Sequence, residues 1–209
     1  MKTRISAIVL LILFFSVSDT CAAWMKKPEL RWRQLYRYDL RQDNHKLYTN
    51  YISAGFSLGR NNEAPFKIIP FFEARRNINR ELWEAKVLGV EVGRDIFSWL
   101  YIGESFKWSW INEDRRNYAV YEKDDSALIQ TRLILSHRLL SNRYINLKGF
   151  ICEEHTFDFE KAGGILNEVS IGLINPVGKY IEIGINWRHI DRIHYYDSDT
   201  FEFSTSIVF

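Results

Sequence analysis

The sequence FEFSTSIVF, residues 201–209, alternates apolar and polar side chains up to the last residue of the chain. Successive side chains of an extended strand point to opposite faces, so this stretch has an apolar face and a polar face. The apolar face carries Phe201, Phe203, Ile207 and Phe209. Such a strand suits a boundary between an apolar phase and a polar space. A half-buried strand of a soluble sheet has the same spacing, so the rest of the chain must decide between the two.

The start of the chain has the features of a secretory signal peptide. Basic residues at positions 2 and 4 precede an apolar run over residues 5–17, and residues 21–23, Cys-Ala-Ala, provide small residues for cleavage. We predict that residues 1–23 are a cleaved signal peptide and that residues 24–209 form one exported domain. A transmembrane anchor is the alternative, but the run is shorter than the roughly 20 apolar residues that cross a bilayer.

Composition excludes several classes of function. Lysine and arginine total 28 against 26 aspartate and glutamate, a net charge of +2, so nothing indicates binding to nucleic acid. Cys152 is the only cysteine beyond the signal peptide, which excludes an internal disulfide and a thiol metal cluster. We therefore expect no metal and no cofactor.

The same alternation recurs along the exported part of the chain. It predicts ten strands of roughly 11 residues, a length that crosses a bilayer at a tilt. Short turns alternate with longer, more charged connections, as in barrels with short periplasmic turns and long outer loops. We predict an all-β, transmembrane, antiparallel up-and-down β-barrel of ten strands, with eight or twelve as alternatives. The predicted strands are residues 30–40, 48–58, 66–75, 82–93, 97–110, 127–138, 144–154, 165–173, 181–188 and 201–209.

Three local features of the sequence predict departures from regular strands. Pro70 indicates an irregularity within its strand, because proline lacks a ladder donor. Within residues 82–93 the apolar set changes from odd to even positions, which predicts a β-bulge near residues 87–89. Residues 93–95, Gly-Arg-Asp, predict a tight turn.

The alternating strands and the terminal Phe209 resemble bacterial outer-membrane β-barrels, whose last strand ends in an aromatic residue read by the barrel-assembly machinery. The overall pattern of strands is similar to that of small barrels of an uncharacterised outer-membrane family. The resemblance implies location in the bacterial outer membrane and no chemistry. It also implies contact with outer-membrane lipid and lipopolysaccharide, and with the assembly machinery and periplasmic chaperones during biogenesis; we expect a monomer. The implied assembly signal is Phe201, Phe203, Ile207 and Phe209.

The predicted inward face carries charges of both signs. In a barrel slightly wider than the eight-stranded size, long charged side chains can meet across the lumen. Each buried charge needs a partner, because an unpaired charge in a dry interior is costly. Two interpretations stay open: a structural ion-pair core, or a narrow pore for small polar solutes with a mild preference for anions. The predicted lumen residues are Arg31, Arg33, Arg37, Glu73, Arg75, Glu84, Lys86, Glu91, Lys107, Arg132, Lys148, Glu154, Glu168, Glu182, Arg188 and Glu202.

A lipid-modifying hydrolase, of the lipid A deacylase or phospholipase type, is the alternative function. Such an enzyme needs a nucleophile and a base within hydrogen-bond reach, and an acid that orients the base. The candidates are Ser136-His137, His155, His189 and His194, and none has the His-x-Ser arrangement familiar from these enzymes. We therefore predict no catalytic residues and no enzyme activity.

Two further alternatives concern the loops and the fold. Paired carboxylates at residues 124–125 and 197–199 suit divalent cations, and Arg115 and Arg116 suit phosphate, although solvated loop charges explain them equally well. The fold alternative is a soluble periplasmic barrel of the lipocalin type, in which the aromatic face would point inward.

Overall fold

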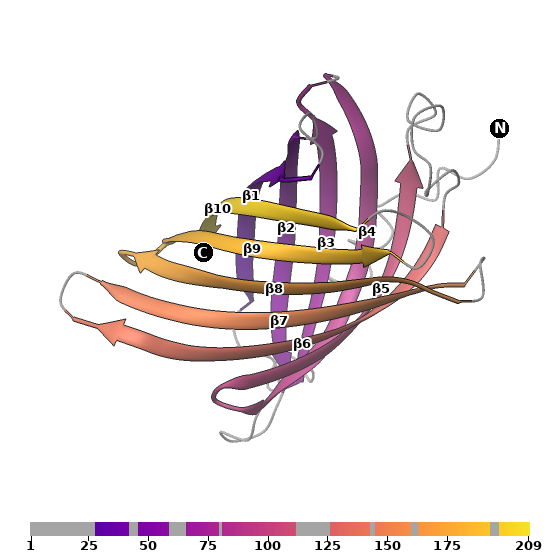
Figure 1. The fold of residues 1–209 in the computed structure, drawn as a ribbon. Helices are drawn as coiled ribbons and strands as arrows, with labels where there is room; N and C mark the ends of the chain where they lie inside the picture. Colours follow the sequence, from indigo (N-terminus) through magenta and orange to yellow (C-terminus); the bar gives the residue numbers. More distant parts are fainter. Residues whose placement is uncertain are drawn as a thin grey trace.

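The computed structural model describes residues 28–41, 46–58, 66–79, 81–111, 126–142, 145–159, 163–192 and 197–209, and these contain ten β-strands. Each strand pairs antiparallel with its neighbour in sequence, and β1 pairs with β10, so the sheet closes into a barrel (Figure 1). The predicted ten-stranded antiparallel barrel is confirmed. In the described ranges, no helix has the length and apolar character needed to cross a membrane. The strands are β1 (Glu29–Asp39), β2 (Lys46–Leu58), β3 (Phe66–Asn77), β4 (Leu82–Phe97), β5 (Leu100–Ile111), β6 (Ser126–Ser141), β7 (Asn146–Asp158), β8 (Gly163–Val177), β9 (Ile181–Arg192) and β10 (Ser198–Val208).

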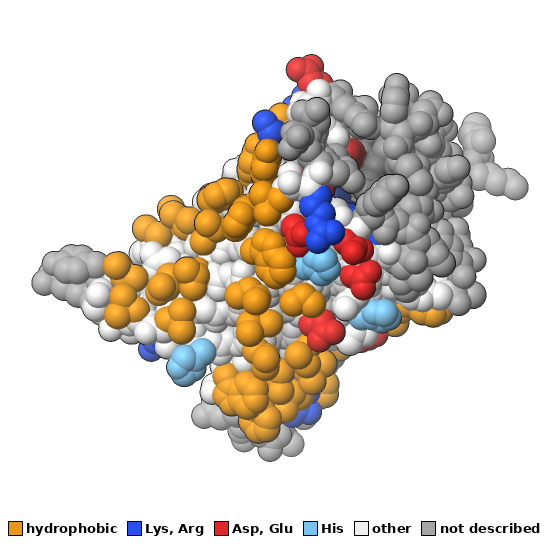
Figure 2. Space-filling model, in the orientation of Figure 1, with side chains coloured by type: hydrophobic (Ala, Val, Ile, Leu, Met, Phe, Trp, Pro, Cys, Tyr) orange, Lys and Arg blue, Asp and Glu red, His pale blue; other side chains and the backbone are white. Residues whose placement is uncertain are grey.

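The two faces of the barrel wall differ as the alternation requires. On β10, Phe201 and Phe203 are exposed on the outside, whereas Glu202 between them is fully buried inside. Large apolar side chains of the other strands are exposed in the same way, and hydrophobic side chains cover much of the outer surface in Figure 2. A barrel of the lipocalin type would have its aromatic face inside, so this arrangement contradicts that alternative.

The seam between β1 and β10 closes the sheet. Tyr36 lies opposite Phe203, so aromatic side chains of both strands share the outer face. Beyond the last ladder pair, the Phe209 N–H donates to the Leu30 carbonyl at 2.9 Å, and the Leu30 N–H donates to the Phe209 carbonyl at 3.3 Å. Closure leaves no unpaired edge between these strands, as a structure surrounded by lipid requires.

Gly93 forms no turn, which corrects the prediction for residues 93–95. β4 continues past it to a turn at residues 98–99, and Gly93 lies opposite Gly103 of β5. The Tyr101 side chain occupies the space beside both glycines. A Cβ on Gly93 would overlap the Tyr101 hydroxyl and ring, and a Cβ on Gly103 would lie 2.9 Å from that hydroxyl. Glycine is therefore needed here for close packing inside the barrel.

The bulge of β4 lies a few residues before its predicted position. The register with β3 shifts between Arg75 and Arg76, which leaves Glu84 as the extra residue of β4. Glu84 is buried, whereas Lys86 lies opposite Ala74 and is exposed on the outer face. The inward assignment of Lys86 is thereby corrected, because an extra residue reverses the facing of every position between the predicted and the observed bulge.

One predicted connection differs in the structure, and the irregularity predicted at Pro70 is present. β7 continues to Asp158 and β8 begins at Gly163, so His155 is a strand residue and the connection is shorter than predicted. The irregularity predicted at Pro70 is confirmed on the β2 side, where the ladder has no pairs between Ser53–Phe71 and Phe56–Ile68, while toward β4 Pro70 lies opposite Val90 without a register shift. The additional pairs between β7 and β8 join residues 155–158 to residues 163–167.

Candidate functional site in the barrel lumen

Glu202 of β10 is fully buried and is held by three side chains. Its Oε1 accepts a hydrogen bond from Arg37 Nε at 2.6 Å, and its Oε2 accepts one from Asn186 Nδ2 at 2.8 Å. Arg188 Nε lies 3.1 Å from the same Oε1. The ladder places Arg37 and Asn186 directly opposite Glu202 on its two neighbouring strands. The carboxylate is therefore neutralised and hydrogen bonded without needing water.

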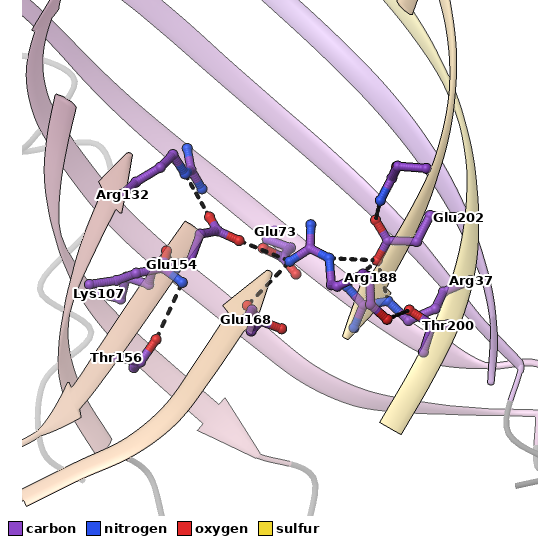
Figure 3. Close-up of polar contacts among 12 residues, drawn as sticks. Arg37, Glu73, Lys107, Arg132, Glu154, Thr156, Glu168, Arg188, Thr200 and Glu202 are labelled. Atoms are coloured by element: carbon purple, nitrogen blue, oxygen red, sulfur yellow. Dashed lines mark hydrogen bonds and ion pairs between the residues drawn. The ribbon is translucent and has the colours of Figure 1, made fainter. Parts of the chain in front are cut away.

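Arg188 of β9 links this group to the next two strands. Its guanidinium donates to Glu154 Oε2 of β7 at 2.9 Å and to Glu168 Oε2 of β8 at 3.2 Å. With Glu202, one arginine thus meets carboxylates from three strands, as the dashed lines in Figure 3 mark. A planar guanidinium with five donors suits several acceptors at once.

Arg132 of β6 carries the ion pairs on to β4. Its Nε donates to Glu154 Oε1 at 2.6 Å and its Nη1 donates to Glu91 Oε2 at 2.7 Å. β5 lies between these strands, and its residue opposite Arg132 is Gly103, which has no side chain to obstruct the contact. The Tyr101 hydroxyl donates to the other Glu91 oxygen at 2.5 Å. A continuous lumen network therefore joins Arg37, Glu202, Arg188, Glu168, Glu154, Arg132 and Glu91.

A branch made of one lysine and two neutral side chains lies beside this network. Lys107 of β5 donates to the Gln130 side-chain oxygen, and the Gln130 amide donates to Thr156 Oγ1 at 3.3 Å. Lys107 Nζ also lies 5.9 Å from the centre of the Phe71 ring, which stacks on Tyr51 with a centroid distance of 5.4 Å. The wall formed by β2 and β3 thus presents aromatic surface to the same lumen.

Charges on opposing walls influence one another. Arg33 of β1 interacts electrostatically with Arg132 of β6, which lies on the far side of the ring of strands. Glu73 of β3 pairs with Arg75 at 2.5 Å and also interacts electrostatically with Lys107 of β5. The side chains therefore reach well into the lumen from several directions.

Most of the predicted lumen residues lie on the inward face. Arg31 pairs with Glu182 at 2.9 Å near the end where β1 begins. Lys148 has inward parity on β7 but is exposed near the same end of the barrel. Lys86 alone among the predicted residues faces outward. The inward set is Arg31, Arg33, Arg37, Glu73, Arg75, Glu84, Glu91, Lys107, Arg132, Lys148, Glu154, Glu168, Glu182, Arg188 and Glu202.

Neutral members of the site were missed by reasoning from charge. Asn186, Tyr101 and Gln130 each hydrogen bond to a charged lumen side chain. Their inward parity on β9, β5 and β6 was a usable signal, because each alternates with outward apolar residues.

The four residues of the expected assembly signal lie on the outer face of β10 or just beyond it. Phe201 and Phe203 are exposed, Ile207 is partly covered, and Phe209 is 67% exposed. Their role in assembly stays a prediction.

Polar residues interrupt the outer face of β5 to β7. Thr131 Oγ1 donates to Glu104 Oε1 at 3.1 Å, and His155 lies opposite Thr131 on the next strand. Glu153 is exposed on the same face. The apolar outer surface is therefore less continuous on this wall than on β9 and β10.

The histidines do not assemble a hydrolase site in the described part of the chain. His137, His155 and His189 all lie on the outer face, and His189 Nδ1 is 2.9 Å from Asp199 Oδ1. No hydroxyl or thiol of a described residue is hydrogen bonded to any of these three rings, so no nucleophile–base pair forms there. His194 lies outside the described residues.

Metal ligation has no support in the described segments. No group of three or more histidine, cysteine, aspartate or glutamate residues within them is arranged to hold a metal ion. Asp199 instead accepts a hydrogen bond from Arg41 Nε at 2.5 Å in addition to its contact with His189. The carboxylates at residues 124–125 and the arginines at 115–116 lie outside the described residues.

Comparison with known proteins gives structural likeness only. Neither a protein-family model nor a curated protein sequence matches the chain. The chain is similar to the KdgM porin in complex with disordered oligogalacturonate, at 9% identity and a TM-score of 0.45, over 87% of this chain and 99% of that one. It is also similar to the NanC porin, at 11% identity and a TM-score of 0.41, over 85% of this chain and 98% of that one. A third similar structure is the translocator domain of the autotransporter NalP from Neisseria meningitidis, at 10% identity and a TM-score of 0.40, over 97% of this chain and 96% of that one.

The fold assignment rests on the strand pairing itself. A closed antiparallel sheet with an apolar outer face and an ion-paired polar interior has the architecture of outer-membrane β-barrels. The chain is a closed, ten-stranded antiparallel barrel with this distribution of side chains.

Proposed function

We propose that the protein is a barrel of the bacterial outer membrane whose lumen is a narrow passage for small polar solutes. The observation that supports the passage is that charged side chains midway along the lumen keep part of their surface uncovered by other protein atoms. Arg132 exposes 27% of its side chain and Glu73 exposes 16%. An ion-pair core that sealed the barrel would bury both partners of each pair.

The outer surface supports the membrane location. Phe203, Ile183 and Ile171 expose about half of their side chains on three adjacent strands, and such a surface is costly in water. Closure of the sheet satisfies the backbone groups that lipid cannot. The signal-like sequence of residues 1–23 supports export through the inner membrane.

Membrane insertion is tested by migration on gels with and without heating of the detergent-extracted protein. A folded barrel migrates differently from its heated form, so we expect two positions. Recovery of the protein in the soluble periplasmic fraction would contradict the membrane location.

The passage is tested by conductance of the purified barrel in a planar lipid bilayer. We expect discrete conductance steps, and heat-denatured protein added at the same concentration serves as the control. Absence of steps across a range of KCl concentrations would contradict a passage and leave the ion pairs a structural role.

A further inference from the structure

Midway along the lumen, arginines are more exposed than the carboxylates they pair with, whereas at the rim the order reverses, as in the pair of Arg31 (32% exposed) with Glu29 (57% exposed). Arg132 is 27% exposed, against 4% for Glu91 and 6% for Glu154. Arg188 is 14% exposed, and its partners Glu154, Glu168 and Glu202 are 6%, 10% and 0% exposed. Arg132 and Arg188 together pair with four carboxylates, so this group carries a net negative charge, but its most exposed charges are the two guanidinium groups.

The same order of exposure holds for two further arginines of the lumen, Arg37 and Arg75. Arg37 is 18% exposed against 0% for its partner Glu202, and Arg75 is 33% exposed against 16% for Glu73. The reason is the length of the side chains. Glutamate holds its carboxylate close to the wall, where neighbouring strands supply donors, whereas the longer arginine extends its guanidinium past the carboxylate toward the lumen.

Arg33 adds a cation without a direct counterion. It faces inward on β1, between Ser206 and Tyr51 in the ladder, and makes no hydrogen bond or ion pair with any described side chain. Glu182, which shares its row, pairs with Arg31 instead. Among charged groups, Glu202 acts most strongly on Arg33 and attracts it, but Arg37 and Arg188 already hold that carboxylate, and the guanidinium groups of Arg188 and Arg132 repel Arg33. Its five donors are thus open to a solute.

We propose that the lumen selects for anions and that Arg33 is the residue at which small oxyanions, carboxylate or phosphate, bind during passage. This inference rests on the proposed pore. A guanidinium group forms paired hydrogen bonds with two oxygens of one such anion, and recessed carboxylates repel it less than exposed ones would. Cations meet the exposed arginines first and are disfavoured.

The test is the reversal potential of the barrel in a planar bilayer under a tenfold KCl gradient, then under a potassium acetate gradient. We expect chloride and acetate each to be more permeant than potassium. The variant Arg33→Gln removes one lumen charge without stranding a carboxylate, and Lys86→Gln removes an equal charge from the outer face as its matched control. For a charge about 5 Å from the ion path at a water-like dielectric, Arg33→Gln lowers anion permeability about fourfold. Lys86→Gln leaves it unchanged.

The outcomes separate the two proposals. Absence of conductance overturns the pore and this inference with it, whereas conductance with a reversal potential at zero or toward potassium overturns the anion preference alone. Equal selectivity of Arg33→Gln and Lys86→Gln overturns the role of Arg33. Arg33→Lys keeps the charge, so it retains selectivity for chloride but loses part of the preference for acetate over chloride. Chloride permeation with exclusion of acetate overturns the oxyanion site.

Discussion

Replacing Glu202 with glutamine is the sharpest perturbation of the lumen network. The amide keeps the size of the side chain but removes the charge that faces Arg37 and Arg188. Its site is fully buried, and removal of one partner from a buried ion pair costs about 3–5 kcal/mol. Arg188 keeps Glu154 and Glu168, and both arginines retain some solvent contact, so we expect the lower end, about 3 kcal/mol.

The assay is urea unfolding of the barrel in lipid vesicles, followed by tryptophan fluorescence. With an m value of about 2 kcal/mol/M, a loss of about 3 kcal/mol lowers the unfolding midpoint by about 1.5 M. Glu182→Gln is the matched control, because Glu182 also faces the lumen but is 24% exposed and pairs with Arg31, which is 32% exposed. That pair is worth less than about 1 kcal/mol, and its midpoint should fall by under about 0.5 M.

Equal midpoints for Glu202→Gln and Glu182→Gln would refute the reasoning that burial decides the value of these pairs. A second measurement distinguishes loss of the ion pair from a general loss of packing. Arg37→Met made in the Glu202→Gln background should cost less than Arg37→Met in the unmodified barrel, because its partner charge is already gone.

The remaining predictions concern assembly, packing and the lumen wall. Phe209→Asp places a charge at the exposed aromatic end of the chain, and we expect most of the protein to lose its heat-modifiable form; normal insertion would contradict the assembly signal. Gly93→Ala forces a Cβ against Tyr101 and should destabilise the barrel by about 1–3 kcal/mol in urea unfolding, whereas Gly55→Ala, with its nearest contact at 3.7 Å, should change stability little. Cys152 is 7% exposed inside the barrel, so a bulky maleimide should label it only after unfolding; rapid labelling of the folded protein would indicate a wider lumen.

Much of the fold could be predicted because a barrel wall is a repetitive structure. Strand number, direction and the exposure of Phe203 follow from alternation, which is a local property of each strand. The positions of turns and bulges were harder to predict from the sequence. Gly93 has the sequence character of a turn, yet it lies in the middle of paired strands because the Tyr101 ring needs its space. No local pattern contains that information, since the two residues belong to different strands.

The sequence by itself indicated most of the charges that lie inside the barrel, but it placed the buried Asp158 in a connection and assigned Lys86 inward, where the bulge of β4 turns it outward. Only the tertiary structure decided which of them pair, how deeply each is buried, and that Arg33 has no direct partner. The physical reason is that side-chain facing depends on neighbours along one strand, whereas pairing depends on register and on reach across strands. The contact of Arg132 with Glu91 illustrates this, because it passes over a strand whose facing residue is a glycine. For Glu202, alternation predicted an inward carboxylate, and only closure of the barrel brought Arg37 beside it.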